Sequence, residues 1–146
     1  MTTKHSRTLP LIALLLAGAA LPALAQQQMP VKSLWLTTAT IANAASLSGS
    51  VDLNGRQLVG IMLPAAWTAA NLTLQASMDG STFFNVYAIG GSEYTATVTA
   101  ASTFIIIPPN DLLGVRYIKL RSGTSGSPVT QGASRTITLA TRAVYQ

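Results

Sequence analysis

The residue types that enzymes most often use for catalysis are nearly missing from this 146-residue chain. It has no cysteine and one histidine, His5, which lies in a predicted leader, so we expect no Ser-His-Asp triad, thiol nucleophile or ordinary structural zinc site. The four carboxylates are scattered: Asp52, Asp79, Glu93 and Asp111. Glycosidases need two carboxylates across one cleft, whereas Asp79 precedes Gly80 in a pattern typical of turns. We predict a protein without enzymatic activity, cofactor or metal.

Aromatic and basic side chains are the remaining candidates for ligand binding. Exposed aromatic faces stack on sugar rings because both surfaces are flat and apolar, and Trp67 and Tyr94 flank predicted strands. The alternative is a place in the core, which we expect for Trp35. Lys119 and Arg121 alternate along a predicted strand and would form a small basic stripe. Two charges without clustered aromatics do not indicate nucleic-acid binding, and a solvated strand face is the plainer interpretation.

The elements that must position these residues are strands. Apolar and polar residues alternate in short segments, as half-buried β-strands require. Nine segments are predicted, at 34–38, 48–53, 57–63, 71–77, 82–88, 94–99, 103–107, 115–121 and 136–145. Asn54-Gly55 and Asp79-Gly80 are expected at hairpin turns because these residue types tolerate positive φ. Many short strands with turn residues between them predict an all-β fold, a single β-sandwich or jelly roll.

The N-terminal residues have the features of a signal peptide. A positively charged start and an uncharged apolar run precede the small residues of Ala23-Leu24-Ala25. We expect a signal peptide over residues 1–25, an N-terminal tail over 26–33 and a β-sandwich domain over 34–146. This predicts a periplasmic or secreted protein with no stable membrane insertion after cleavage. The alternatives are an uncleaved anchor and a true start near Met29, which would make the leader spurious.

The segment 122–134 differs from its surroundings, since it consists mostly of glycine, serine, threonine and other small or polar residues. A loop of this length in a small domain is either functional or mobile. A flexible connection between two strands is the simpler interpretation.

Two segments resemble known families. Residues 74–86, with Ser77-Met78-Asp79-Gly80, resemble a hairpin of discoidin-type domains, which are galactose-binding-like jelly rolls found in many carbohydrate-binding modules. Residues 115–120 are similar to a late strand of that family. The resemblance implies a binding module but transfers no ligand-binding residue, because the family's ligand loops vary, and its frequent cysteine pair is missing here. The pattern over 55–87 and 116–142 also looks like small β-sandwich proteins from structural gene clusters of tailed phages, which would not ordinarily carry a leader.

Two functions therefore stand as hypotheses. The first is an exported, non-catalytic module that binds glycans or another surface. The alternative is a virion structural protein that decorates a capsid or tail, with its true start near Met29. Few charges protect the predicted sheet edges, and uncharged edges pair with other chains. We therefore also expect self-association into a homo-oligomer, or docking to a protein surface.

Overall fold

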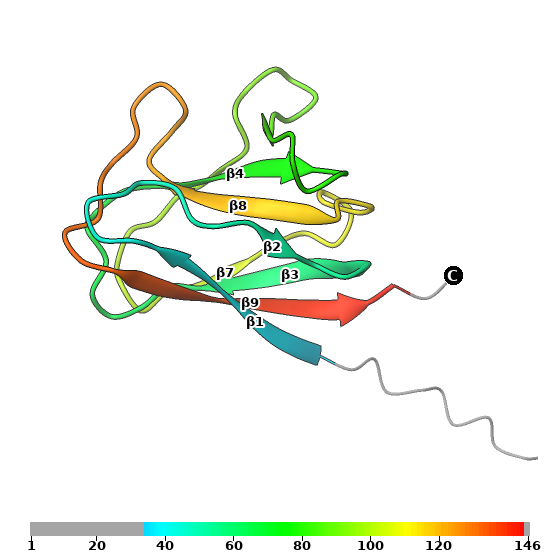
Figure 1. Cartoon of the computed structure of the whole chain (residues 1–146), viewed down its shortest axis with the longest axis horizontal. Coiled ribbons are helices and arrows are strands. Elements are labelled where there is room, and N and C mark those ends of the chain that lie inside the picture. Colours follow the sequence, from blue (N-terminus) through cyan, green and yellow to red (C-terminus); the bar gives the residue numbers. More distant parts are fainter. Residues whose placement is uncertain (1–33, 145–146) are drawn as a thin grey trace, which may run out of the picture. The chain divides into compact units, whose positions relative to one another are not determined.

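The computed structural model describes residues 34–144, which form nine β-strands (Figure 1). The strands are β1 (Leu34–Ile41), β2 (Val51–Asp52), β3 (Arg56–Met62), β4 (Leu72–Ser77), β5 (Phe84–Asn85), β6 (Thr95–Ala96), β7 (Phe104–Ile106), β8 (Tyr117–Ser122) and β9 (Arg135–Ala143). This part of the chain contains no helix, and so none that is long and apolar enough to cross a membrane. The predicted signal peptide, 1–25, and tail, 26–33, lie outside the described residues.

The strands form two antiparallel sheets that lie as two layers (Figure 1). Sheet A has four strands in the order β1-β9-β3-β7. Sheet B has the order β2-β8-β4-β5, and β6 also pairs with β4. A bulge between Leu58 and Gly60 shifts the register of β3 against β9. The all-β sandwich predicted from alternation is therefore confirmed, and each predicted segment contains or overlaps a strand.

The core lies between the two sheets. Ile61 of β3 and Leu139 of β9 pack in one cluster with Leu120 of β8, and none of the three is measurably exposed. Successive side chains of a strand point to opposite faces, so the alternating apolar residues found in the sequence supply both inner faces. This burial supplies the main driving force for folding.

One turn prediction is confirmed and the other needs correction. Asp79-Gly80 lies between the paired strands β4 and β5, and Gly80 has a φ of 78°. Asn54 and Gly55 also have positive φ, 52° and 68°, and the turn is closed by a 2.9 Å hydrogen bond from the Arg56 N–H to the Leu53 carbonyl. However, this turn joins β2 of sheet B to β3 of sheet A and makes no hairpin. β2 pairs with β8 instead, and Leu53, which follows β2, is buried between the sheets where the chain crosses.

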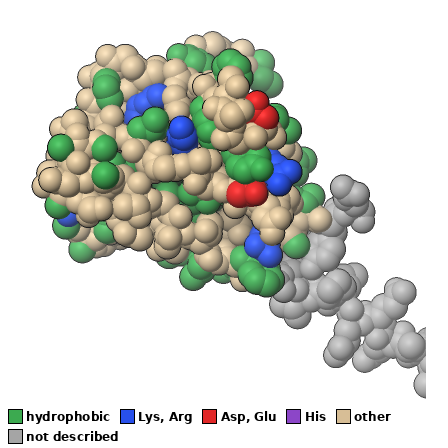
Figure 2. Space-filling view, viewed as in Figure 1, with side chains coloured by type: hydrophobic (Ala, Val, Ile, Leu, Met, Phe, Trp, Pro, Cys, Tyr) green, Lys and Arg blue, Asp and Glu red, His purple; other side chains and the backbone are tan. Residues whose placement is uncertain are grey.

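The predicted core position of Trp35 is wrong. Its side chain is 49% exposed, and the guanidinium carbon of Arg56 lies 4.0 Å from the centroid of its ring. The physical reason is the place of β1 at the edge of sheet A, where a side chain has a neighbouring strand on one side only. On the face shown in Figure 2, the charged side chains are few and lie as separate spots among apolar side chains, other uncharged side chains and backbone.

Candidate ligand-binding hollow

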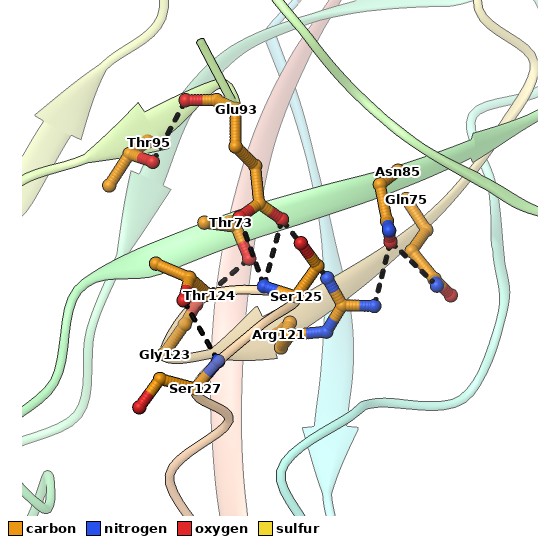
Figure 3. Close-up of polar contacts among 10 residues, drawn as sticks. All are labelled: Thr73, Gln75, Asn85, Glu93, Thr95, Arg121, Gly123, Thr124, Ser125 and Ser127. Carbon is orange, nitrogen blue, oxygen red and sulfur yellow. Dashed lines mark hydrogen bonds and ion pairs between the residues drawn. The ribbon is translucent and has the colours of Figure 1, made fainter.

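The predicted basic stripe lies on the outward face of β8, but its two members are engaged by other side chains. Arg121 is buried, and its Nη1 lies 3.2 Å from Oε1 of Glu93. Its Nη2 donates a 2.8 Å hydrogen bond to Oδ1 of Asn85 (Figure 3). The Nζ of Lys119 lies 4.1 Å from the centroid of the Phe83 ring. The Arg121 guanidinium therefore holds the fold together and is not presented to a ligand.

The same ion pair fixes the loop 122–134. The Ser125 N–H donates to both carboxylate oxygens of Glu93, at 3.0 and 2.9 Å (Figure 3). Further along the loop, the fully buried Gln131 donates a 2.7 Å hydrogen bond to Oγ of Ser122. Hydrogen bonds therefore hold this loop at Ser125 and at Gln131, which a flexible connection between two strands would not require.

Trp67 is half-buried and packs against the core. Its Nε1 donates a 3.1 Å hydrogen bond to the carbonyl of Ala70. The exposed part of its ring borders a recess of only about 60 Å³, which is too small for a sugar ring. The structure places Trp67 apart from the residues that line the hollow around Tyr94.

Tyr94 lines a surface hollow of about 490 Å³. The hollow is also lined by Tyr87, Ile89, Asn110 and Asp111, which come from two separate segments of the chain. Tyr87 is 53% exposed and Ile89 is fully exposed, so both aromatic and aliphatic surface is available to a ligand. A concave site with apolar walls and a few convergent polar groups is the usual form of a small-ligand site.

One wall of the hollow is a short hairpin over residues 86–94. The Tyr94 N–H donates to the Val86 carbonyl at 2.8 Å, and the Ala88 N–H donates to the Ser92 carbonyl at 2.8 Å. The turn is closed from the Gly91 N–H to the Ala88 carbonyl at 2.9 Å, and Gly91 has a φ of 81°, which glycine adopts without strain. Tyr87 therefore stands on one arm, Tyr94 on the other and Ile89 at the tip.

The other wall follows β7. Pro108 and Pro109 end the extended segment, and a turn is closed from the Asp111 N–H to the Pro108 carbonyl at 3.2 Å. The next residue, Leu112, is buried in the core. Because the buried Leu112 follows directly in the chain, Asn110 and Asp111 are held in a defined place at the surface.

A hydrogen bond of 2.9 Å joins the two walls, donated by the Tyr94 hydroxyl to Oδ2 of Asp111. Burial, followed by this hydrogen bond and the negative charge of Asp111, raises the pKa of Tyr94 to about 12. The phenol therefore stays neutral and acts as a donor. A neutral phenol, a carboxylate and an amide can exchange hydrogen bonds with ligand hydroxyls, while the ring of Tyr87 offers a flat apolar surface.

Two other hollows are less suited to a polar ligand. In a hollow of about 400 Å³ beside Met78 and Phe84, Oδ1 of Asp79 is occupied by its own turn. In a hollow of about 580 Å³, Arg56 stacks on Trp35, and Arg116 stacks on Tyr117 and pairs with Asp52. Over residues 34–144, no three His, Cys, Asp or Glu side chains come together as a metal site would require.

Sequence reasoning selected Tyr94 but missed Tyr87, Asn110 and Asp111. A signal for Tyr87 was present, because Tyr87 and Tyr94 bracket Gly90-Gly91, a pattern that suits a short hairpin. In the sequence, Asp111 was only one of four scattered carboxylates. Nothing local in the sequence indicates that the turn 108–111 meets the hairpin.

Comparison with known proteins gives little help with function. No family model and no curated protein matches the chain. Among solved structures, it is similar to the crystal structure of Yersinia pseudotuberculosis-derived mitogen, at 11% identity and a TM-score of 0.39, over 80% of this chain and 90% of that one. A similarity this weak supports no conclusion, so the description of the site rests on this chain's own residues.

Proposed function

We propose that this chain is an exported, non-catalytic β-sandwich module that binds a glycan in the hollow between the hairpin 86–94 and the turn 108–111. The observation that carries the proposal is that Tyr87, Tyr94, Asn110 and Asp111 all line one surface hollow. Sugars present both a flat apolar face and hydroxyls, and this set of side chains matches both.

The resemblance to discoidin-type domains supports the same proposal. Residues 74–86 and 115–120 overlap β4, β5 and β8, which lie next to one another in sheet B. These segments are scaffold, and the proposed ligand residues lie outside them, apart from the border residue Val86. The signal-peptide features of residues 1–25 support export, since a glycan-binding module acts where glycans are displayed.

A binding experiment with two exposed aromatic residues tests the proposal. The protein is screened against immobilised neutral and acidic glycans, and Tyr87→Ala is compared with Phe84→Ala, a residue that is 69% exposed and outside the hollow. Loss of a stacking ring worth about 1.4 kcal/mol weakens the Kd about tenfold. We expect that loss for Tyr87→Ala alone. Equal effects of the two substitutions, or no glycan bound by the unsubstituted protein, would contradict the proposal.

The second candidate is a virion structural protein with its start near Met29. The observation that favours it is the uncharged edge strand β1, in which Leu34 and Leu36 are 63% and 62% exposed, since proteins in regular arrays need such contacts. The mass of the N-terminal peptide of the native protein separates the candidates. A chain that begins at Gln26 supports export, and one that begins at Met29 or Pro30 supports the virion protein.

A further inference from the structure

β1 differs from every other edge strand among the described residues. It has eight residues, LWLTTATI, without charge or proline, and it forms one edge of sheet A. The opposite edge, β7, has three residues and is followed closely by Pro108 and Pro109. In sheet B, the edge strands β2, β5 and β6 have two residues each. Short strands and prolines protect an edge from pairing with other chains, and β1 has neither protection.

The backbone of β1 also presents unpaired groups. Residues of an antiparallel strand alternate between those that bond to the neighbour and those whose N–H and C=O point away from it. The Thr40 carbonyl accepts a 3.4 Å hydrogen bond from the Gly49 N–H, so Thr40 points away from β9. By alternation, Leu34, Leu36 and Thr38 point the same way. Among residues 34–144, no strand pairs with this side of residues 34–38, which thus form a free edge that ends where Ser48 and Gly49 cover the end of β1.

We infer that the free edge of β1 pairs with β1 of a second copy of this chain, antiparallel and about a two-fold axis at Leu36. Leu36 is the midpoint of the free stretch 34–38, so centring there pairs all of it, with Leu34 opposite Thr38 of the second copy. A two-fold axis makes such pairing self-complementary. The two four-stranded sheets then become one continuous sheet of eight strands.

Charge does not oppose a second copy at this place. Lys and Arg outnumber Asp and Glu by six to four over residues 34–144, so two copies repel each other only weakly, and least where the contact is uncharged. β1 itself has no charged side chain, and its free edge brings together leucine and threonine, while Arg56 covers the Trp35 ring on the other face of the sheet. Leu36 has its side chain on the outward face of sheet A, 62% exposed, and in the dimer it contacts its own equivalent.

Single cysteines test both the pairing and its register, because the chain has no cysteine of its own. Directly opposed residues of a hydrogen-bonded pair have Cα atoms about 5.5 Å apart, within the range of a disulfide. Two copies of Leu34 would be about 13 Å apart, four residues out of register. On mild oxidation, we expect Leu36→Cys to give about tenfold more covalent dimer than Leu34→Cys or the exposed control Phe84→Cys, because opposed thiols have a high effective concentration.

Three outcomes would overturn the inference. They are Leu36→Cys forming no more dimer than Phe84→Cys, Leu34→Cys forming as much as Leu36→Cys, and a purified unsubstituted protein that sediments as a monomer throughout the micromolar range. Leu36→Lys provides a second measurement without oxidation. It should abolish self-association, while Phe84→Lys, at a comparably exposed position in sheet B, should leave it intact.

Discussion

The outward faces of the two sheets are built from different kinds of side chain. On sheet B, Gln75, Asn85, Glu93 and Arg121 bond to one another, and the ion pair is about nine-tenths buried (Figure 3). On sheet A, one row across the strands consists of Leu36, Ala140, Gly60 and Ile106, and its two outer members are 62% and 75% exposed. The polar side chains of sheet B bond to one another, whereas the apolar side chains at the edges of sheet A are exposed to solvent.

This difference teaches that the charges of the Glu93–Arg121 pair on sheet B serve the internal structure of the domain. The charged residues of sheet B fix the hairpin 86–94 and the loop 122–134 against the sheet, through Glu93. We propose that contacts with other molecules are made by the loops, where the hollow lies, and by the uncharged edge of sheet A. The following changes test this division.

Breaking the buried ion pair should have the largest effect on stability. Glu93→Gln leaves the Arg121 guanidinium without its counter-charge, with a side chain only 10% exposed. Removal of one partner of a buried pair costs about 3 kcal/mol of unfolding free energy or more. Urea denaturation measures the change. The control is Asp52→Asn, which breaks the Arg116 pair at 3.5 Å, where the side chains are 41% and 54% exposed, and should cost less than about 1 kcal/mol. Equal losses of unfolding free energy for Glu93→Gln and Asp52→Asn would contradict a structural role of the buried ion pair.

Replacing one glycine near each sheet by alanine should cost different amounts of unfolding free energy. The added Cβ would meet backbone atoms at Gly123 and a movable side chain at Gly60. A Cβ at Gly123, where φ is 85°, would lie 2.4 Å from the Ser127 carbonyl oxygen and 2.7 Å from the Val129 nitrogen. Backbone cannot move aside easily, so we expect Gly123→Ala to cost about 2 kcal/mol.

The matched substitution in sheet A is Gly60→Ala. Its Cβ would lie 2.5 Å from the tip of the Phe104 ring, but this ring is 53% exposed and can turn into solvent. We expect a cost below about 1 kcal/mol, as for a surface substitution. Thermal unfolding of both variants gives the comparison. A larger loss of stability for Gly60→Ala than for Gly123→Ala would contradict this expectation.

The smallest expected effect is a pH dependence from the turn between β4 and β5. Hydrogen bonds from the Thr82 and Ser81 N–H groups and the Ser77 hydroxyl hold the pKa of Asp79 well below its usual value of 3.8. Because the pKa is lower in the folded state, the ionised carboxylate stabilises the fold above about pH 4, and this contribution is lost as the pH falls further. The melting temperature should therefore decrease below pH 4. Asp79→Asn should flatten that decrease, and an unchanged slope would show that other groups cause it.

The fold could be predicted from the sequence because alternation and turn residues are local signals. All nine predicted segments contain or overlap strands, and Asp79-Gly80 makes its turn between consecutive strands. The choice of partner strand is not local, which explains why Asn54-Gly55 was wrongly assigned to a hairpin. Both turns have positive φ, and the assignment of β2 and β3 to different sheets depends on strand partners that lie far away in the sequence.

The candidate site was less accessible to sequence reasoning. Tyr94 was identified as an aromatic residue beside a strand, but its partner Asp111 lies 17 residues away, in a turn whose position depends on Leu112 in the core. Arg121 was selected as a ligand residue by its type. Its ion pair with Glu93, 28 residues away, forms only in the folded chain.

The most direct test of the proposed binding site is a map of amide chemical shifts during titration with the glycan that binds most tightly in the screen. The account predicts shifts confined to residues 86–94 and 108–112, where the walls of the hollow lie, and saturation with one Kd. Shifts concentrated on β1 and β7, at the outward face of sheet A, or spread along Lys119 and the neighbouring residues of β8, would contradict it.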